Sequence, residues 1–407
     1  MEKTKITKRV EKHRINKGHP YYKMLDDFCF KSKNLYNFAN YQIRQQFIKD
    51  NKFLNYCNLD KLLKTKDMDF DYRNMCSAVA SQQLLKLLEK NWKSFFKSIK
   101  DWSKNKEKYK GRPKLPGYID KDGRNLVVLT YTACKIKDGL IHFPKTFQGF
   151  TLKTNVINLQ QVRILPRTNH FVIELVYNIP ITKIKQDNVR YLGIDIGLDN
   201  LATVCNNVGV TPFIISGREI KSINQYYNKQ KAHYQEIAER MNKTKQTARL
   251  ERLTRKRTDK IDTLLHTASK KIIDEAVRLK CNTIVIGKNK QWKTEINIGK
   301  VNNQKFVIIP HARFIEMIKY KAEHRGIKCI ETEESYTSST SFLDNETPIK
   351  ENYNKKRRIT RGLFKANDGT IINADLNGAY QITKKIFPDA FIKKIKHKTH
   401  PIRIKFF

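Results

Sequence analysis

An aspartate inside an apolar run constrains the fold of this chain most. Residues 191–198 read YLGIDIGL, which is typical of a strand buried in a sheet. Asp195 lies within this run, and an ionised carboxylate there is costly unless it is paired or coordinates a metal ion. Gly193 and Gly197 flank it at alternate positions, where a missing side chain allows another group to approach closely. Asp195 is therefore a candidate site residue, and an aspartate that caps a turn is the alternative.

The pattern around this run predicts an α/β domain over residues 186–407. Short apolar runs predict further strands at LATVCN (201–206), FIISG (213–217), CNTIVIG (281–287) and IKCIETEE (327–334). Helices are expected over a stretch dense in Lys, Arg and Gln at 218–280, at 309–325 and at 373–387.

The first half of the chain predicts a different architecture. Its segments read as a strand at 1–15, helices at 22–48 and 77–100, a basic Pro- and Gly-containing linker or surface loop at 104–122, and short β-rich runs at 125–179. The β-rich runs suggest a small barrel or sheet, and a boundary near 180–190 separates the two halves.

A second carboxylate, Asp375, lies at the start of the last predicted helix, in INADLNGAYQI. Its alternative role is to cap that helix. Asn373 and Asn377 beside it are available to bond phosphate or metal-bound water. Two such carboxylates brought together can hold Mg²⁺ ions, which clamp the attacking and leaving oxygens of a phosphodiester displacement.

The charge predicts a polyanionic partner. The chain has 81 Lys and Arg against 39 Asp and Glu, a formal net charge of +42. Nucleic acid fits this excess best, because each neutralised phosphate releases a counterion. A membrane surface is the alternative, but the sequence shows no lipidation signal, amphipathic basic helix or apolar run of about 18 residues.

The cysteines predict a reducing, cytosolic location. The seven cysteines include no C-x-x-C pair, which argues against a disulfide framework and a cysteine-based zinc site. The first ten residues, MEKTKITKRV, lack an apolar signal region.

Six segments, in this order and at these spacings, resemble the TnpB family of transposon-associated RNA-guided nucleases, which is related to type V CRISPR effectors and Fanzor proteins. They are SKNLYNFANYQIRQQF (32–47), GRPKLPGY (111–118), GIDIGLDNLAT (193–203), IVIGKNKQWKTE (284–295), EESYTSSTSFLD (333–344) and NADLNGAYQI (373–382). The resemblance implies a wedge-like β-barrel from 1–20 and 105–185, an inserted helical recognition lobe at 21–104, and an α/β ribonuclease H-like (RuvC) domain at 186–407. It also implies a guide RNA and a double-stranded DNA target beside a short flanking motif, in the prokaryotic cytosol.

The resemblance places Asp195 at the first RuvC position and Asp375 at the third. Many TnpB proteins carry the second metal ligand, a glutamate, where this chain has Gly287. The resemblance thus implies catalysis and metal binding by Asp195, Asp375 and a relocated glutamate, or a protein that has lost cleavage.

The run IKCIETEE is expected to lie beside the strand that ends at Gly287, and a glycine there leaves space for a side chain from its neighbour. Period-2 alternation puts Glu331 and Glu333 on one face, and Glu333 is nearer the strand end, where α/β sites gather. We therefore expect Glu333 to be the third catalytic and metal-binding carboxylate. For the same position Glu334 is the second choice and Glu295 the last. The alternative for all three glutamates is a solvated acidic turn.

The segment 337–372 departs from the family's zinc ribbon. Ser341 and Asp344 replace the first cysteine pair, and no Cys or His occurs from 341 to 390, so we expect no zinc there. Packing of Phe342, Leu343 and Phe364 would hold the segment, and RRITRG (357–362) would contact nucleic acid.

Two basic or polar stretches are candidates for nucleic-acid binding, since Arg and Lys bind phosphates and Asn and Gln read base edges. The candidate residues are Lys33, Asn34, Asn40, Arg44 and Gln45 in the first helix, and Arg249, Arg252, Arg255, Lys256 and Arg257 in a basic helix expected to contact a guide–target heteroduplex.

These features favour an RNA-guided, Mg²⁺-dependent endodeoxyribonuclease. The alternative from another class is a nuclease-inactive RNA-guided DNA-binding repressor, which Gly287 favours unless a glutamate has moved. A DNA-strand transferase is the third hypothesis, and the guide-binding lobe implied for residues 1–185 counts against it.

Overall fold

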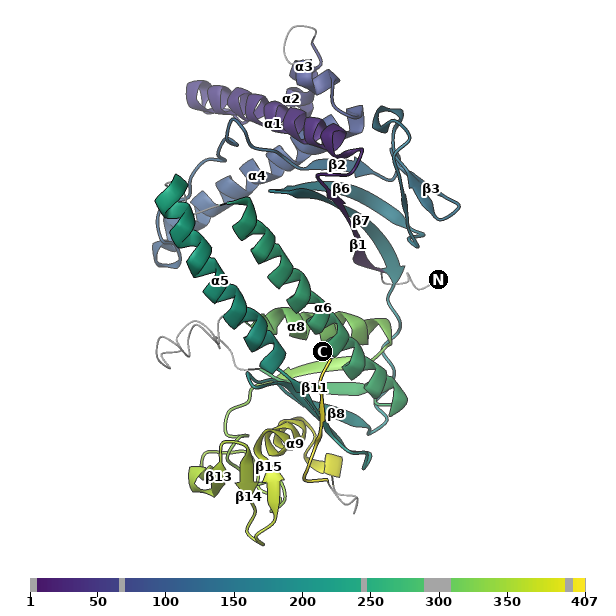
Figure 1. Ribbon diagram of the computed structural model, residues 1–407. Helices are drawn as coiled ribbons and strands as arrows, with labels where there is room; N and C mark the ends of the chain where they lie inside the picture. Colours follow the sequence, from purple (N-terminus) through teal and green to yellow (C-terminus); the bar gives the residue numbers. More distant parts are fainter. Residues whose placement is uncertain (1–5, 66–69, 243–246, 289–308, 392–397, 407) are drawn as a thin grey trace. The chain divides into compact units, whose positions relative to one another are not determined.

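A computed structural model describes residues 6–65, 70–242, 247–288, 309–391 and 398–406 of the chain (Figure 1). The chain divides into two compact units, Met1–Pro180 and Ile181–Phe407. Glu295, one of the candidate carboxylates, lies outside the described residues.

The strands of the first unit form two antiparallel sheets. The larger has the order β1-β7-β6-β2, from β1 (Ile6–Asn16), β7 (His170–Pro180), β6 (Leu159–Arg167) and β2 (Val127–Thr130). The smaller contains β3 (Lys135–Lys137), β4 (Leu140–His142) and β5 (Thr151–Lys153). Since β1 and β2 are edges of the larger sheet in the described residues, the closed barrel stays a prediction.

Two long helices of the first unit, α1 (Tyr22–Asp50) and α4 (Ala78–Lys104), pack against the larger sheet. The short helices α2 (Tyr56–Leu63) and α3 (Phe70–Arg73) pack against α1 and α4, and 3₁₀ turns form at η1 (Lys106–Lys108) and η2 (Lys145–Phe147). Ser77 caps α4 by accepting a hydrogen bond from the Ala80 N–H at 3.2 Å. The apolar face of α4 joins α1 and the sheet in one core, in which Trp92 is fully buried among phenylalanine rings.

The second unit is built on a mixed six-stranded sheet of order β12-β11-β8-β9-β10-β16. Its strands are β8 (Tyr191–Asp195), β9 (Asn200–Asn206), β10 (Phe213–Ser216), β11 (Thr283–Gly287), β12 (Lys328–Thr332) and β16 (Ile402–Ile404). Strands β8, β9 and β10 pair antiparallel, whereas β11 is parallel to β8 and β12 is parallel to β11. The predicted mixed α/β architecture of this half is confirmed.

Helices cover both faces of this sheet. They are α5 (Arg218–Asn242), α6 (Ala248–Arg278), α8 (His311–His324) and α9 (Ala374–Ile386). Figure 1 shows α9 on the opposite side of the sheet from α6 and α8. A small sheet follows from β13 (Arg358–Thr360), β14 (Leu363–Lys365) and β15 (Ile371–Asn373), with 3₁₀ turns η3 (Lys355–Arg357) and η4 (Pro388–Phe391).

The alternation along β8 decides which side chains face α9. Leu192 and Ile194 are buried in the core shared with α6 and α8. Gly193 faces the other way, where an added Cβ would overlap the Thr383 hydroxyl and lie 2.9 Å from the Ala379 carbonyl oxygen of α9. Glycine is therefore required for α9 to pack this closely on the strand. Asp195 follows two residues later and faces the same helix.

Candidate active site

Asp195 is the last residue of β8 and lies against the first turns of α9. A Cβ added at Gly378 of α9 would lie 3.0 Å from Asp195 Oδ2, so a small residue at this helix position makes room for the carboxylate. Burial raises the pKa of Asp195 well above its usual value, and the charges of Glu334 and Asp375 raise it further. Arg358 opposes this increase in the pKa of Asp195.

Asp375 lies in the first turn of α9, next to the residue that caps the helix. The cap is Asn373, whose Oδ1 accepts the Leu376 N–H at 3.0 Å. Capping therefore does not account for Asp375, although the helix dipole favours a carboxylate in this turn. Asp375 Oδ2 instead accepts a hydrogen bond of 2.5 Å from Asn200 Nδ2 at the start of β9.

Glu334 fills the space that Gly287 leaves at the end of β11. A Cβ added at Gly287 would lie 2.7 Å from both Cγ and Oε1 of Glu334. Strand β12 pairs with β11 so that Thr332 is opposite Gly287, and Glu334 reaches back across the sheet edge from two residues further along. Burial raises the pKa of Glu334 to about 7.

The structure does not bring Glu333, the glutamate preferred from the sequence, to this cluster. Strand β12 ends at Thr332, so the period-2 alternation that selected Glu333 does not continue to it. A turn follows, in which the Thr337 hydroxyl donates to the Glu334 carbonyl at 2.8 Å. Glu333 is left exposed and Glu334, the second candidate, lies beside Asp195.

Glu331 is engaged elsewhere. Its carboxylate pairs with Lys288 at 2.7 Å and with Lys319 at 2.8 Å. These two lysines hold the pKa of Glu331 below its usual value against the opposing effect of burial. Such a paired carboxylate stabilises the strand rather than joining the cluster.

The donor chemistry of Asp195, Glu334 and Asp375 fits a hard cation. Glu334 and Asp375 both raise the proton affinity of Asp195, and an oxygen-liganded ion such as Mg²⁺ would offset this repulsion between carboxylates. As arranged within the described residues, however, no three His, Cys, Asp or Glu side chains already form a metal-binding group. Asn200 Oδ1 is buried without a hydrogen-bond partner next to this cluster.

The predicted nucleic-acid-binding residues of α1 mostly bond to the protein itself. Lys33 is only 5% exposed and donates to the Lys121 carbonyl at 2.9 Å. Asn34 donates to Asp71 at 2.8 Å, while Asn40 and Arg44 donate to the Pro116 carbonyl at 3.0 and 2.6 Å. Gln45 is half-buried, and its side chain makes no hydrogen bond to another residue in the part of the chain that the structure describes.

In α6, two of the five predicted contacts join the helix to α5. Arg249 donates to the Tyr234 hydroxyl at 2.6 Å and lies 4.0 Å from the centre of its ring. Arg257 donates to Asn224 at 2.6 Å, and burial lowers its pKa. The remaining three basic residues are the exposed Arg252 and Lys256 and the half-buried Arg255.

An ion-pair network that sequence reasoning missed holds the segment 337–372. Arg357 pairs with Asp344 and, at 2.6 Å, with Glu346, and its side chain is only 13% exposed. Asp344 also accepts the Asn367 N–H at 3.1 Å. The signal in the sequence was Asp344, which stands where the family has a cysteine, together with the nearby Arg357 as a candidate partner for its charge. The expected packing of Phe342, Leu343 and Phe364 is confirmed, since these residues form a core with α9.

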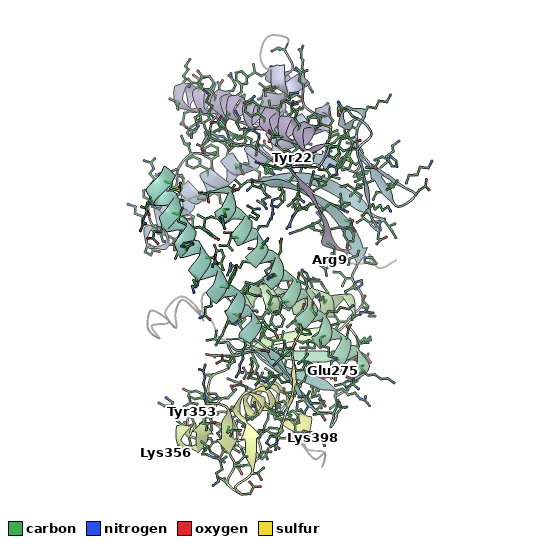
Figure 2. All side chains as sticks on the ribbon, in the orientation of Figure 1. Arg9, Tyr22, Glu275, Tyr353, Lys356 and Lys398 are labelled. Carbon is green, nitrogen blue, oxygen red and sulfur yellow. The ribbon has the colours of Figure 1, made fainter. Side chains whose placement is uncertain are left out.

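Other basic residues of this segment are available at its surface. Arg361, in the predicted contact RRITRG, is 81% exposed and pairs with Asp199 at 3.2 Å. Figure 2 shows Tyr353 and Lys356 projecting from the same segment.

None of the described helices combines the length and apolar composition that a membrane span requires.

Fold and site together define a mixed α/β protein in which three acidic side chains from distant parts of the chain meet at the end of a central strand. Residues 174–293 match the OrfB_IS605 family model, described as a probable transposase. Residues 311–382 match the Cas12f1-like TNB domain. The predicted resemblance is thereby confirmed, and each of the two matches covers only part of this chain.

Solved structures similar to this chain include three of CRISPR effectors. A Cas12f1–sgRNA–target DNA complex is 15% identical over 93% of this chain and 100% of that chain, with a TM-score of 0.37. A CRISPR–Cas12f ternary complex is 15% identical over 92% and 82%, with a TM-score of 0.39. CasPhi-2 (Cas12j) bound to crRNA is 9% identical over 96% and 99%, with a TM-score of 0.40. Among curated protein sequences, none matches this chain.

Proposed function

We propose that this protein is an RNA-guided DNA endonuclease of the TnpB type, which cleaves double-stranded DNA beside a short flanking motif by metal-dependent hydrolysis. The observation that carries the proposal is the position of Glu334 in the space over Gly287, beside Asp195. Glu334 would supply the third carboxylate, which many TnpB proteins carry at the position of Gly287. The absence of a glutamate at that position therefore does not argue against catalysis.

The sheet topology supports a RuvC-like assignment for the second unit. Numbered along the chain from β8, its first five strands have the order 3-2-1-4-5, with the second strand antiparallel to the first. This is the arrangement of ribonuclease H-like folds, and it brings the ends of β8 and β11 together.

Asp195, Glu334 and Asp375 would hold Mg²⁺, which when bound activates a water nucleophile and stabilises the charge that develops on the phosphate. Asn200 holds Asp375 in place through its amide N–H. Burial of Asp195 and Glu334 keeps bulk water away from the carboxylates and strengthens their interaction with a cation. The excess of 42 positive charges suits a complex with a guide RNA and a target DNA.

The test is to express the protein with RNA from its own locus, sequence the bound RNA, and incubate the complex with a plasmid library of randomised flanks. We expect cleavage at one flanking motif with Mg²⁺ and none with EDTA. Glu334→Gln should abolish cleavage, and Glu333→Gln, which removes an adjacent exposed charge, should not. Tight guided binding without cleavage at any flank would support the nuclease-inactive repressor instead.

A further inference from the structure

The segment that joins α4 to β2 has no regular secondary structure over residues 112–120, yet it follows a fixed course past α1. We call residues 109–121 the strap. Four α1 side chains bond to its backbone: Lys33, Asn37, Asn40 and Arg44. Their spacing of four, three and four residues places them in one stripe along the helix.

Asn37 binds the strap as a neighbouring strand would. Its Nδ2 donates to the Ile119 carbonyl at 2.8 Å, and its Oδ1 accepts the Ile119 N–H at 2.8 Å. Both backbone groups of one strap residue are thereby satisfied by one side chain. The bond pair fixes the register of the strap on α1.

Asn40 extends this grip into the core of the unit. It is fully buried, donates to the Pro116 and Gly117 carbonyls at 3.0 and 3.3 Å, and accepts the Trp92 indole N–H at 2.9 Å. Arg44 donates to Pro116 at 2.6 Å and lies 4.6 Å from the centre of the Tyr118 ring. Ordering an irregular segment costs conformational entropy, which these bonds help to offset.

The strap exposes three basic side chains at alternate positions, Lys110, Arg112 and Lys114. The preceding α4 and η1 continue this spacing, so that every second residue from 104 to 114 is an exposed Lys or Arg: Lys104, Lys106, Lys108, Lys110, Arg112 and Lys114. The exposed acidic residues are Glu107 in η1 and Asp120 in the strap. Leu115 and Ile119 pack inward against the core. In an extended backbone, alternate residues lie roughly 6–7 Å apart on one side, close to the rise of two phosphates along a duplex strand.

We propose that the strap is a preorganised contact for a nucleic-acid phosphate backbone, and that the polar stripe of α1 positions the strap. This inference rests on the nucleic-acid partners of the proposed function. It assigns the direct contact to Lys110, Arg112 and Lys114, and a positioning role to Asn37 and Asn40. The phosphates belong to the guide RNA or to the target DNA, which the experiment distinguishes.

The test measures affinity as a function of salt concentration, first for guide RNA and the protein, then for target duplex and the protein–RNA complex. We compare Arg112→Ala/Lys114→Ala with Lys97→Ala/Lys100→Ala, which removes two exposed charges from α4 of the same unit. Loss of two phosphate contacts should lower the slope of log K against log salt by about 1.4–1.8 in one of the two measurements. The α4 variant should leave both slopes unchanged.

Asn37→Ala tests the positioning role, because it keeps every charge and loosens the strap. We expect several-fold weaker binding in the same measurement, with a melting curve that shows a folded protein. Slopes of the Arg112/Lys114 variant equal to those of the α4 variant would overturn the inference, as would wild-type affinity in Asn37→Ala. Wild-type protein that binds no RNA would instead overturn the proposed function.

Discussion

Substitution of Gly287 by alanine tests whether Glu334 is the relocated carboxylate. The added Cβ would lie 2.7 Å from Glu334 Cγ and 2.6 Å from Ile382 Cδ1. The isoleucine methyl group is the far end of a flexible side chain and can turn away. The added Cβ overlaps Glu334 at Cγ as well as at the carboxylate oxygen Oε1, so rotation of the carboxylate alone cannot relieve the overlap. The whole Glu334 side chain, and the turn that carries it, must therefore move.

Two magnitudes follow from this geometry. Overpacking of this kind costs about 1–3 kcal/mol, which lowers the melting temperature of a unit this size by about 2–12 °C. A displacement of about 1 Å at a reacting centre costs about 100-fold in rate. We therefore expect Gly287→Ala to cleave about 100-fold more slowly while guided DNA binding is retained.

The assay compares single-turnover cleavage and target binding by the same protein–RNA complex. Gly18→Ala is the matched control, since an added Cβ there meets nothing within 4 Å. In a Glu334→Gln background, Gly287→Ala should add little, because the group that it displaces is already disabled. Cleavage by Gly287→Ala within about threefold of the Gly18→Ala rate would refute the placement of Glu334 in the site.

Three further outcomes are expected. Arg357→Met should lower the free energy of unfolding by about 3 kcal/mol, because it leaves two partly buried carboxylates without their cation, and thermal melting should show the loss with or without a zinc chelator. In metal-free protein, kept so with EDTA, burial in the folded state raises the pKa of Glu334 from 4.5 to about 7. The folded state therefore holds this proton more tightly than the unfolded state, and the free energy of unfolding falls as the pH rises from about 4.5 through about 7. Melting temperatures from pH 5 to 8 should show this fall, and Glu334→Gln should reduce it. Arg257→Ala should lower the melting temperature through its lost bond to Asn224, whereas Lys256→Ala should weaken nucleic-acid binding and leave the melting temperature unchanged.

Strands β8 to β11 of the second unit were predictable because each is a short apolar run. Strands β13 to β16, which have three residues each, were not predicted. Burial on both faces leaves a continuous apolar signal, as in residues 283–287, where every position is buried. Asp195 stood out for the same reason, since it breaks such a run. The sequence also identified Gly287 as the position that lacks the family's glutamate. A missing side chain at a strand end leaves a space that another side chain must fill.

The choice between Glu333 and Glu334 was not predictable from alternation. It depends on where β12 ends, and Thr332 is its last residue. Beyond that point the turn and the packing of α9 orient the side chains, and neither leaves a periodic signal. A shift of one residue moves a side chain to the other face, so the end of β12 decides which of the two glutamates lies beside Asp195.

The roles of the polar residues in α1 were ambiguous for a chemical reason. The amide of Asn40 presents the same donor and acceptor to a base edge and to a peptide backbone. Its partners, Pro116 and Gly117, lie 76 and 77 residues further along the chain. Only the folded structure shows that the Asn40 amide bonds to the peptide backbone of these two residues.

The order of the three carboxylates along the chain has a consequence for protein synthesis. Asp195 is made early in the second unit, Glu334 much later, and Asp375 with α9 last of all. An incomplete chain that ends before α9 lacks both the third carboxylate and the helix that packs over β8. Under the proposed function, a nascent chain in which α9 has not yet been made cannot cut DNA.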